Sequence, residues 1–159
     1  MKEKSQMIAS TVGRVPLNTP ECLNERIRER TKANVAMYAS RGSSAIAERL
    51  AELEQEWDVE RMLETNASVG CLVGLTLGAT VDRKWFIIPA VIAGFLLQHA
   101  VQGSCPPMPI LRQMGFRTAT EIDYERYALK AIRGDFRDVT GNVRRTAAGA
   151  HNAIEAART

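Results

Sequence analysis

The charge distribution along the chain constrains the fold more than any motif does. Residues 66–81 and 85–103 contain no Asp, Glu, Lys or Arg, and the run Asp82-Arg83-Lys84 separates them. Elsewhere charged residues occur every few positions. Two apolar segments joined by a short polar turn are typical of two helices that enter a bilayer together. We therefore predict an all-α protein in which residues 65–105 form a membrane helical hairpin of two short transmembrane helices, flanked by cytoplasmic amphipathic helices.

Small residues recur at helical spacing in both apolar segments. In the first segment, glycine occurs at every fourth position, which places Gly70, Gly74 and Gly78 on one helix face. Each glycine costs about 1 kcal/mol relative to alanine in a soluble helix, whereas in a membrane it lets a second backbone approach closely. Ala90 and Gly94 give the second segment a small face that we expect to pack on this glycine groove. The alternative is a buried helix in a soluble bundle.

The first segment is short for a complete crossing of the bilayer. Its 16 residues rise about 24 Å, against a hydrocarbon core of about 30 Å. A re-entrant hairpin is therefore an alternative to a spanning one. The turn carries only two of the 21 Lys and Arg residues, so the positive-inside rule predicts that both termini are cytoplasmic.

The chain before the hairpin divides into a tail and a helical part. We expect residues 1–19 to be a disordered tail and residues 20–64 to form cytoplasmic helices over about 20–39 and 45–64. One apolar stripe follows the second of these helices at Ile46, Leu50, Leu53 and Trp57. No residue breaks this pattern before Asn66, so we expect the helix to continue into the membrane, with Trp57 and Arg61 near the interface.

Residues 106–136 are expected to form an interfacial turn and then an amphipathic basic helix. Three prolines at positions 106, 107 and 109 end the second apolar segment, while Thr118, Glu121 and Gly134 delimit a helix over about 119–133. One side of this helix carries the basic residues Arg126, Lys130, Arg133 and Arg137. These side chains form either a solvated face or a lipid-facing surface that binds anionic headgroups. Residues 137–159 are an Ala-rich tail.

No residue pattern predicts catalysis, a metal site or a cofactor. The three cysteines (Cys22, Cys71 and Cys105) form no CxxC pair, and the chain contains no P-loop, GxSxG or HExxH motif. Cys105, with His99 nearby in sequence, is the one candidate thiol site. Its place after a helix C-terminus disfavours a thiolate, so a structural role in the Cys-Pro turn is the alternative. The net charge of +3 gives no reason to expect a nucleic-acid partner.

The sequence Gly103-Ser104-Cys105-Pro106, followed by Ile110-Leu111, comes directly after the apolar hairpin. In this combination the chain resembles the YgaP-like inner-membrane transmembrane domain family over about residues 60–115. The resemblance implies a membrane hairpin in a bacterial inner membrane, and through rhodanese domains carried by some relatives it implies a loose link to sulfur handling. The chain has no room for a rhodanese domain.

Two functional hypotheses follow. The first is a non-catalytic integral membrane protein that packs through its glycine groove with itself or with a larger membrane complex, in contact with membrane lipids. The second is a sulfur-related transfer or export function that uses Cys105 at the cytoplasmic interface.

Overall fold

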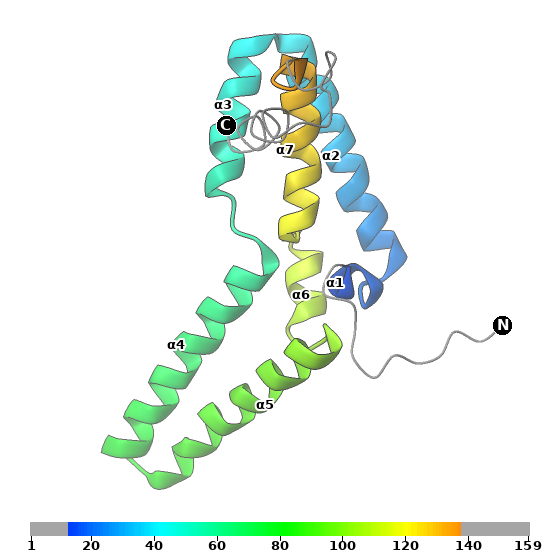
Figure 1. Cartoon of the computed structure of the whole chain (residues 1–159). Coiled ribbons are helices and arrows are strands. Elements are labelled where there is room, and N and C mark those ends of the chain that lie inside the picture. The colour runs from blue at the N-terminus through cyan, green and yellow to red at the C-terminus, as the bar shows by residue number, and fades with distance from the viewer. Residues whose placement is uncertain (1–12, 138–159) are drawn as a thin grey trace, which may run out of the picture. The chain divides into compact units, whose positions relative to one another are not determined.

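The structure is a computed structural model that describes residues 13–137, and all regular elements in this range are helical (Figure 1). The prediction of an all-α fold is therefore confirmed. The contacts within the chain divide it into two compact units. The first unit consists of the residues up to Ile27 together with Trp57–Ala119, and the second consists of Arg28–Glu56 together with the residues from Thr120. The elements are α1 (Arg14–Leu17), α2 (Glu21–Arg41), α3 (Ser43–Gln55), α4 (Val59–Thr80), the 3-10 helix η1 (Arg83–Phe86), α5 (Ile87–Gln102), α6 (Met108–Gln113) and α7 (Ala119–Arg133).

The first unit contains a hairpin of two long helices. Helix α4 and helix α5 lie side by side, and η1 joins them at the charged turn (Figure 1). Pro89 lies in the first turn of α5, where its missing N–H leaves no hydrogen bond unmade. Gly103 ends α5 in a left-handed conformation, with φ of 74°, and its N–H donates to the His99 carbonyl at 2.7 Å. Helix α5 together with η1 (Arg83–Gln102) is long and apolar enough to cross a membrane, by length and composition.

The open end of this hairpin, which we call the hairpin base, holds the core of the first unit. This core is formed by Val15, Val59, Leu63, Cys105, Met108 and Leu111. Val15 comes from α1, a short helix in residues that the sequence placed in a disordered tail. That prediction is wrong for residues 13–19, because Val15 is 2% exposed and the Thr19 hydroxyl donates to its carbonyl at 2.8 Å. Residues 1–12 lie outside the described part of the chain.

The predicted continuous helix over 45–64 is interrupted at residues 56–58. Glu56 adopts an extended conformation after α3, and Asp58 then starts α4 by accepting a hydrogen bond from the Arg61 N–H at 2.6 Å. An aspartate N-cap satisfies one of the free N–H groups of a first helical turn, so it favours a new start at this point. Trp57 leaves the predicted apolar stripe and is exposed, with the Arg61 guanidinium 4.6 Å from its ring centroid.

The second unit packs parts of α2, α3 and α7 around one apolar core. Ile46, Leu50 and Leu53 from α3 face Ile122 and Leu129 from α7, and Val35 and Tyr38 of α2 pack against them. The predicted helix over 119–133 is confirmed, and Gly134 follows it with φ of 94°. The expected interfacial turn contains a helix instead, since α6 buries Met108 and Leu111 in the core of the first unit. The predicted tail at 137–159 lies outside the described residues, except for Arg137.

Candidate functional site

The glycine face of α4 is filled by side chains of the same chain. A Cβ atom added at Gly70 would lie 2.8 Å from the Ile92 Cδ1 atom, and one at Gly74 would lie 2.6 Å from the Pro89 Cδ atom. The same addition at Gly78 would lie 2.7 Å from the Phe86 ring. Real Cβ atoms do not approach other atoms so closely, so the three glycines are what allow α5 and η1 to pack on α4.

Ala90 and Gly94, which the sequence placed in this contact, lie outside it. Both are exposed, and an added Cβ at Gly94 would meet nothing within 4 Å. The physical reason is that large side chains of α5 and the Phe86 ring of η1 fill the groove. Two small faces are not needed for close packing when large side chains fit into the space that glycine leaves.

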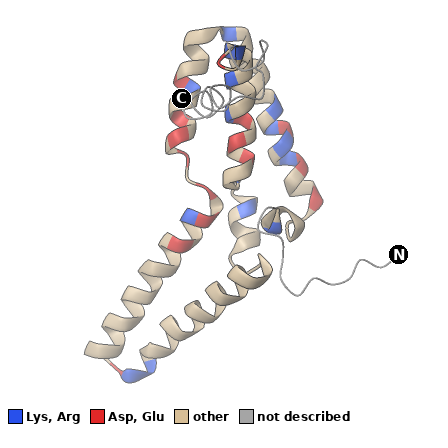
Figure 2. Ribbon diagram, in the orientation of Figure 1, with Lys and Arg blue, Asp and Glu red and all other residues tan. Residues whose placement is uncertain are grey.

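The outer surface of the hairpin is apolar and uncovered. Its most exposed side chains include Leu72, Ile87 and Leu97, each between 65% and 67% exposed. Charged residues occur only where α4 begins and at the turn from Asp82 to Lys84 (Figure 2). Two threonines of α4 form hydrogen bonds within the helix: the Thr76 hydroxyl donates to the Leu72 carbonyl at 2.8 Å, and the Thr80 hydroxyl to the Thr76 carbonyl at 2.7 Å.

The candidate thiol site is not assembled in the structure. Cys105 is 6% exposed at the hairpin base, and burial raises the pKa of its thiol above the usual value, although a hydrogen bond from the Met108 N–H opposes this effect. Neither ring nitrogen of His99 has a hydrogen-bond partner, so His99 is not hydrogen-bonded to the thiol in this structure. A buried, protonated thiol is a poor nucleophile.

Beside Cys105 lies an apolar cavity of about 260 Å³, formed between α4, α5 and the segment that begins α6. Leu63, Ala67, Phe95, Leu96 and Leu111 line it together with the cysteine. The amide nitrogen of Asn66, which also lines the cavity, donates to the Met62 carbonyl at 2.9 Å. The cavity therefore offers apolar surface and very few polar groups to a ligand.

The four basic residues of the predicted lipid-facing surface do not form one open face. Lys130 is 3% exposed, and its ammonium group lies 5.9 Å from the centroid of the Tyr127 ring. Burial is the main cause that lowers the pKa of Lys130. Arg126 pairs with Asp123, and Arg133 Nε donates to Asp135 at 2.7 Å. Of the four, only Arg137 is exposed, so these residues serve contacts within the second unit more than a headgroup surface.

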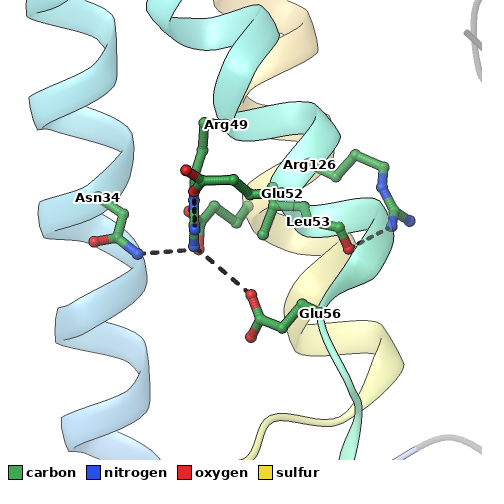
Figure 3. Close-up of polar contacts among 7 residues, drawn as sticks. Asn34, Arg49, Glu52, Leu53, Glu56 and Arg126 are labelled. Carbon is green, nitrogen blue, oxygen red and sulfur yellow. Dashed lines mark hydrogen bonds and ion pairs between the residues drawn. The ribbon is translucent and has the colours of Figure 1, made fainter.

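A buried polar cluster in the second unit was not predicted from the sequence. Glu125 on α7 is fully buried and accepts a hydrogen bond from Arg49 Nε at 2.8 Å, while Arg49 also pairs with Glu52 at 2.8 Å and with Glu56 at 3.7 Å. Asn34 on α2 donates to the same glutamate at 3.4 Å (Figure 3). The only sequence signal is the position of Glu125 between the buried residues Ile122 and Leu129, which places it on the core side of an amphipathic helix.

Within the described residues, no group of three or more His, Cys, Asp or Glu side chains is placed to hold a metal ion. Comparisons with protein-family models, with curated proteins and with solved structures found no match for the chain.

Proposed function

We propose that the protein is a non-catalytic integral membrane protein that its α4–α5 hairpin anchors in a bacterial inner membrane, with both termini in the cytoplasm. The observation that carries this proposal is the exposed apolar outer surface of the hairpin. In Arg83–Gln102, only 6% of the apolar window is buried within the chain. A soluble protein rarely leaves so much contiguous apolar surface uncovered, whereas lipid covers it without cost.

The ends of the two helices support a spanning hairpin over a re-entrant one. Among the described helices, only α5 with η1 is long and apolar enough to cross a membrane, whereas α4 has 22 residues and rises about 33 Å but carries charged residues in its first turns. Trp57 lies just before α4 and Arg61 lies in its first turn. Trp85 follows Arg83 and Lys84 at the turn of the hairpin. Tryptophan and basic residues at both ends of an apolar segment are typical of the two membrane interfaces.

The hydrogen bonds inside the hairpin also fit a lipid environment. Unsatisfied polar groups cost several kcal/mol in hydrocarbon, and Thr76 and Thr80 avoid this cost by donating to their own helix. We further propose that assembly with a second copy, or with a larger membrane complex, uses surfaces other than the glycine groove, because α5 fills that groove. No contact in the structure favours sulfur transfer through the buried Cys105.

Washing of native membranes at alkaline pH tests the membrane proposal. We expect the full-length protein to stay in the membrane pellet, as integral proteins do. A matched variant, Leu72→Asp with Leu97→Asp, places two charges on the exposed surface and should shift the protein toward the supernatant. Release of the unmodified protein by the wash would contradict the proposal.

Crosslinking in the same membranes tests the assembly proposal separately. We expect crosslinked species larger than the monomer, formed by a second copy or by a membrane partner. Gly94→Leu should reduce them if the open face of α5 takes part, whereas a strictly monomeric protein would exclude assembly without affecting the membrane proposal.

A further inference from the structure

The apolar cavity at the hairpin base is larger than close packing normally leaves in a protein. Its volume is about 260 Å³, and it lies between α4, α5 and the segment that begins α6. Close-packed interiors contain few voids larger than a water molecule. In another protein, an engineered apolar cavity of about 150 Å³ stays dry and binds benzene. The cavity of this chain therefore has room for an apolar group larger than a benzene ring.

Water is a poor occupant of this cavity. A buried water molecule needs about two to four polar partners. Among the described residues that line the cavity, only Asn66 and Cys105 have a polar atom in the side chain. The Asn66 amide nitrogen already donates to the Met62 carbonyl, and a thiol is a weak hydrogen-bond partner. An apolar occupant loses nothing by this lack of polar partners, so the wall favours it over water.

The cavity opens onto the apolar outer surface of the hairpin. Phe95 lines the cavity and is 40% exposed, and Asn66 and Pro107 also line it and are exposed. The outer surface next to this opening includes Val91, one helical turn before Phe95, and Leu97. Apolar matter that covers the outer surface can therefore enter the cavity without passing through water.

The charges of α4 place the cavity near the end of the apolar region. Glu60, Arg61 and Glu64 lie in the first turns of the helix, and no charged residue follows until Asp82. Leu63 and Ala67, which line the cavity, stand at this boundary. In a bilayer, acyl chains begin directly below the layer of charged headgroups. The cavity thus lies at a depth that the first part of an acyl chain reaches.

We propose that the cavity holds one acyl chain of a phospholipid from the cytoplasmic leaflet, inserted between α4 and α5 at the hairpin base. This inference rests on the membrane location and orientation proposed above. Among the described residues, no charged side chain lines the cavity, so it recognises the alkyl chain and not the headgroup. Burial of methylene groups against Leu63, Ala67 and Leu96 supplies the binding free energy.

A phosphatidylethanolamine with a diazirine on one acyl chain tests this site. The full-length protein is placed in liposomes of phosphatidylethanolamine and phosphatidylglycerol that contain the probe, and adducts are mapped by mass spectrometry after illumination. Cys105 and Leu111 line the cavity and are only 6% and 7% exposed, so adducts on them report a chain inside it. Leu72 and Leu97 report lipid on the outer surface. We expect adducts at both pairs.

The two pairs separate this inference from the membrane proposal. Adducts at Leu72 and Leu97 without adducts at Cys105 and Leu111 would overturn the acyl-chain site and leave the membrane proposal standing. A lack of adducts at both pairs would contradict both. Labelling of Cys105 and Leu111 by a free fatty acid with the same diazirine, but not by the phospholipid, would also overturn the assignment to a lipid.

Filling the cavity provides the matched comparison. Ala67→Phe places a phenyl ring in the space of the chain, whereas Ala93→Phe places the same ring on the exposed side of α5. Each methylene group displaced from apolar surroundings weakens binding about fourfold, so Ala67→Phe should lower the adducts at Cys105 and Leu111 about tenfold or more relative to Leu72. Ala93→Phe should leave this ratio unchanged.

Equal ratios in Ala67→Phe and in the unmodified protein would overturn the inference. If Ala67→Phe does not fold, the smaller Ala67→Leu takes its place. It should lower the ratio about fourfold or more, and an unchanged ratio in that variant overturns the inference in the same way.

Discussion

Of the three glycines on the packed face of α4, Gly74 leaves the least space for a side chain. A methyl group there would meet both Pro89 and Ile88, with the nearest separation at 2.6 Å. In the sequence, the spacing of four residues places the glycines on one helix face, and the second apolar segment was expected to pack against that face through Ala90 and Gly94. In the structure, larger side chains such as Pro89 and Ile88 fill the groove instead, because the spacing of small residues does not show which side chains of the partner enter it.

The change Gly74→Ala should destabilise the hairpin by about 1–3 kcal/mol through overpacking, even though alanine favours the helix. Gly94→Ala is the matched control, because its added methyl group meets nothing and should leave stability equal or up to about 1 kcal/mol higher. Unfolding in detergent micelles, followed by circular dichroism, measures both. Equal shifts for the two variants would show that the glycine face is not close-packed.

The three thiols should differ widely in reactivity. Cys22 is exposed, Cys71 is partly exposed and Cys105 is buried with a raised pKa. We expect a water-soluble maleimide at neutral pH to modify Cys22 first and to leave Cys105 unmodified until the protein is denatured, as measured by mass spectrometry of peptides. Rapid modification of Cys105 in the folded protein would revive the hypothesis of a functional thiol.

At the scale of the elements, the sequence predicted helices better than it predicted their ends. The helix over 119–133 has strong signals at both ends, in Thr118 and Gly134, and the structure agrees with it. The break at residues 56–58 has one weak signal in the sequence, the N-cap residue Asp58. This aspartate is hard to recognise as a cap because it stands in a run of acidic residues. Helix α1 could not be predicted, because four helical residues are too few to show a periodicity. The helix is held in place by contacts that Val15 and Arg14 make with residues far away in the sequence.

The packing of α3 against α7 depends on the buried pair of Arg49 and Glu125. Glu125→Ala would leave Arg49, whose side chain is 13% exposed, with Glu52 and Glu56 as its remaining ion-pair partners. We expect a loss of about 3 kcal/mol in the unfolding free energy, at the low end for a broken buried pair because those two partners stay. Chemical denaturation measures this loss. Glu29→Ala, which breaks an exposed pair with Lys32, is the control and should cost less than about 0.5 kcal/mol.

The turn after α7 should respond to acid. Arg133 hydrogen-bonds to the Asp135 carboxylate and holds its pKa below the usual value, with burial opposing this effect. A lowered pKa in the folded state means that the interaction stabilises the protein above about pH 4 and is lost as the pH falls further. NMR signals of Gly134 and Asp135 should therefore shift below about pH 4, and Asp135→Asn should remove that transition. A transition that persists in Asp135→Asn would assign it to another carboxylate.

At the scale of the whole molecule, the two tryptophans report whether the hairpin crosses a bilayer. Trp57 precedes α4 and Trp85 follows it, so the 22 residues of the helix separate them by about 33 Å. In sealed liposomes with one orientation of the protein, iodide added outside should quench only one of the two. The variants Trp57→Phe and Trp85→Phe assign the signals, and quenching of both from one side would favour a re-entrant hairpin.

Asp82, Arg83 and Lys84 form the turn of the hairpin, and in the proposed orientation they must be carried through the membrane during insertion. Their net charge of +1 moves outward against an inside-negative potential, at a cost of about 2.3 kcal/mol per 100 mV. The Asp82 carboxylate accepts a hydrogen bond from the Lys84 N–H at 2.8 Å, so the turn closes on itself. Biosynthesis of the protein should therefore depend on an insertion machinery and on the energised state of the membrane, and the turn is the part of the chain that sets this demand.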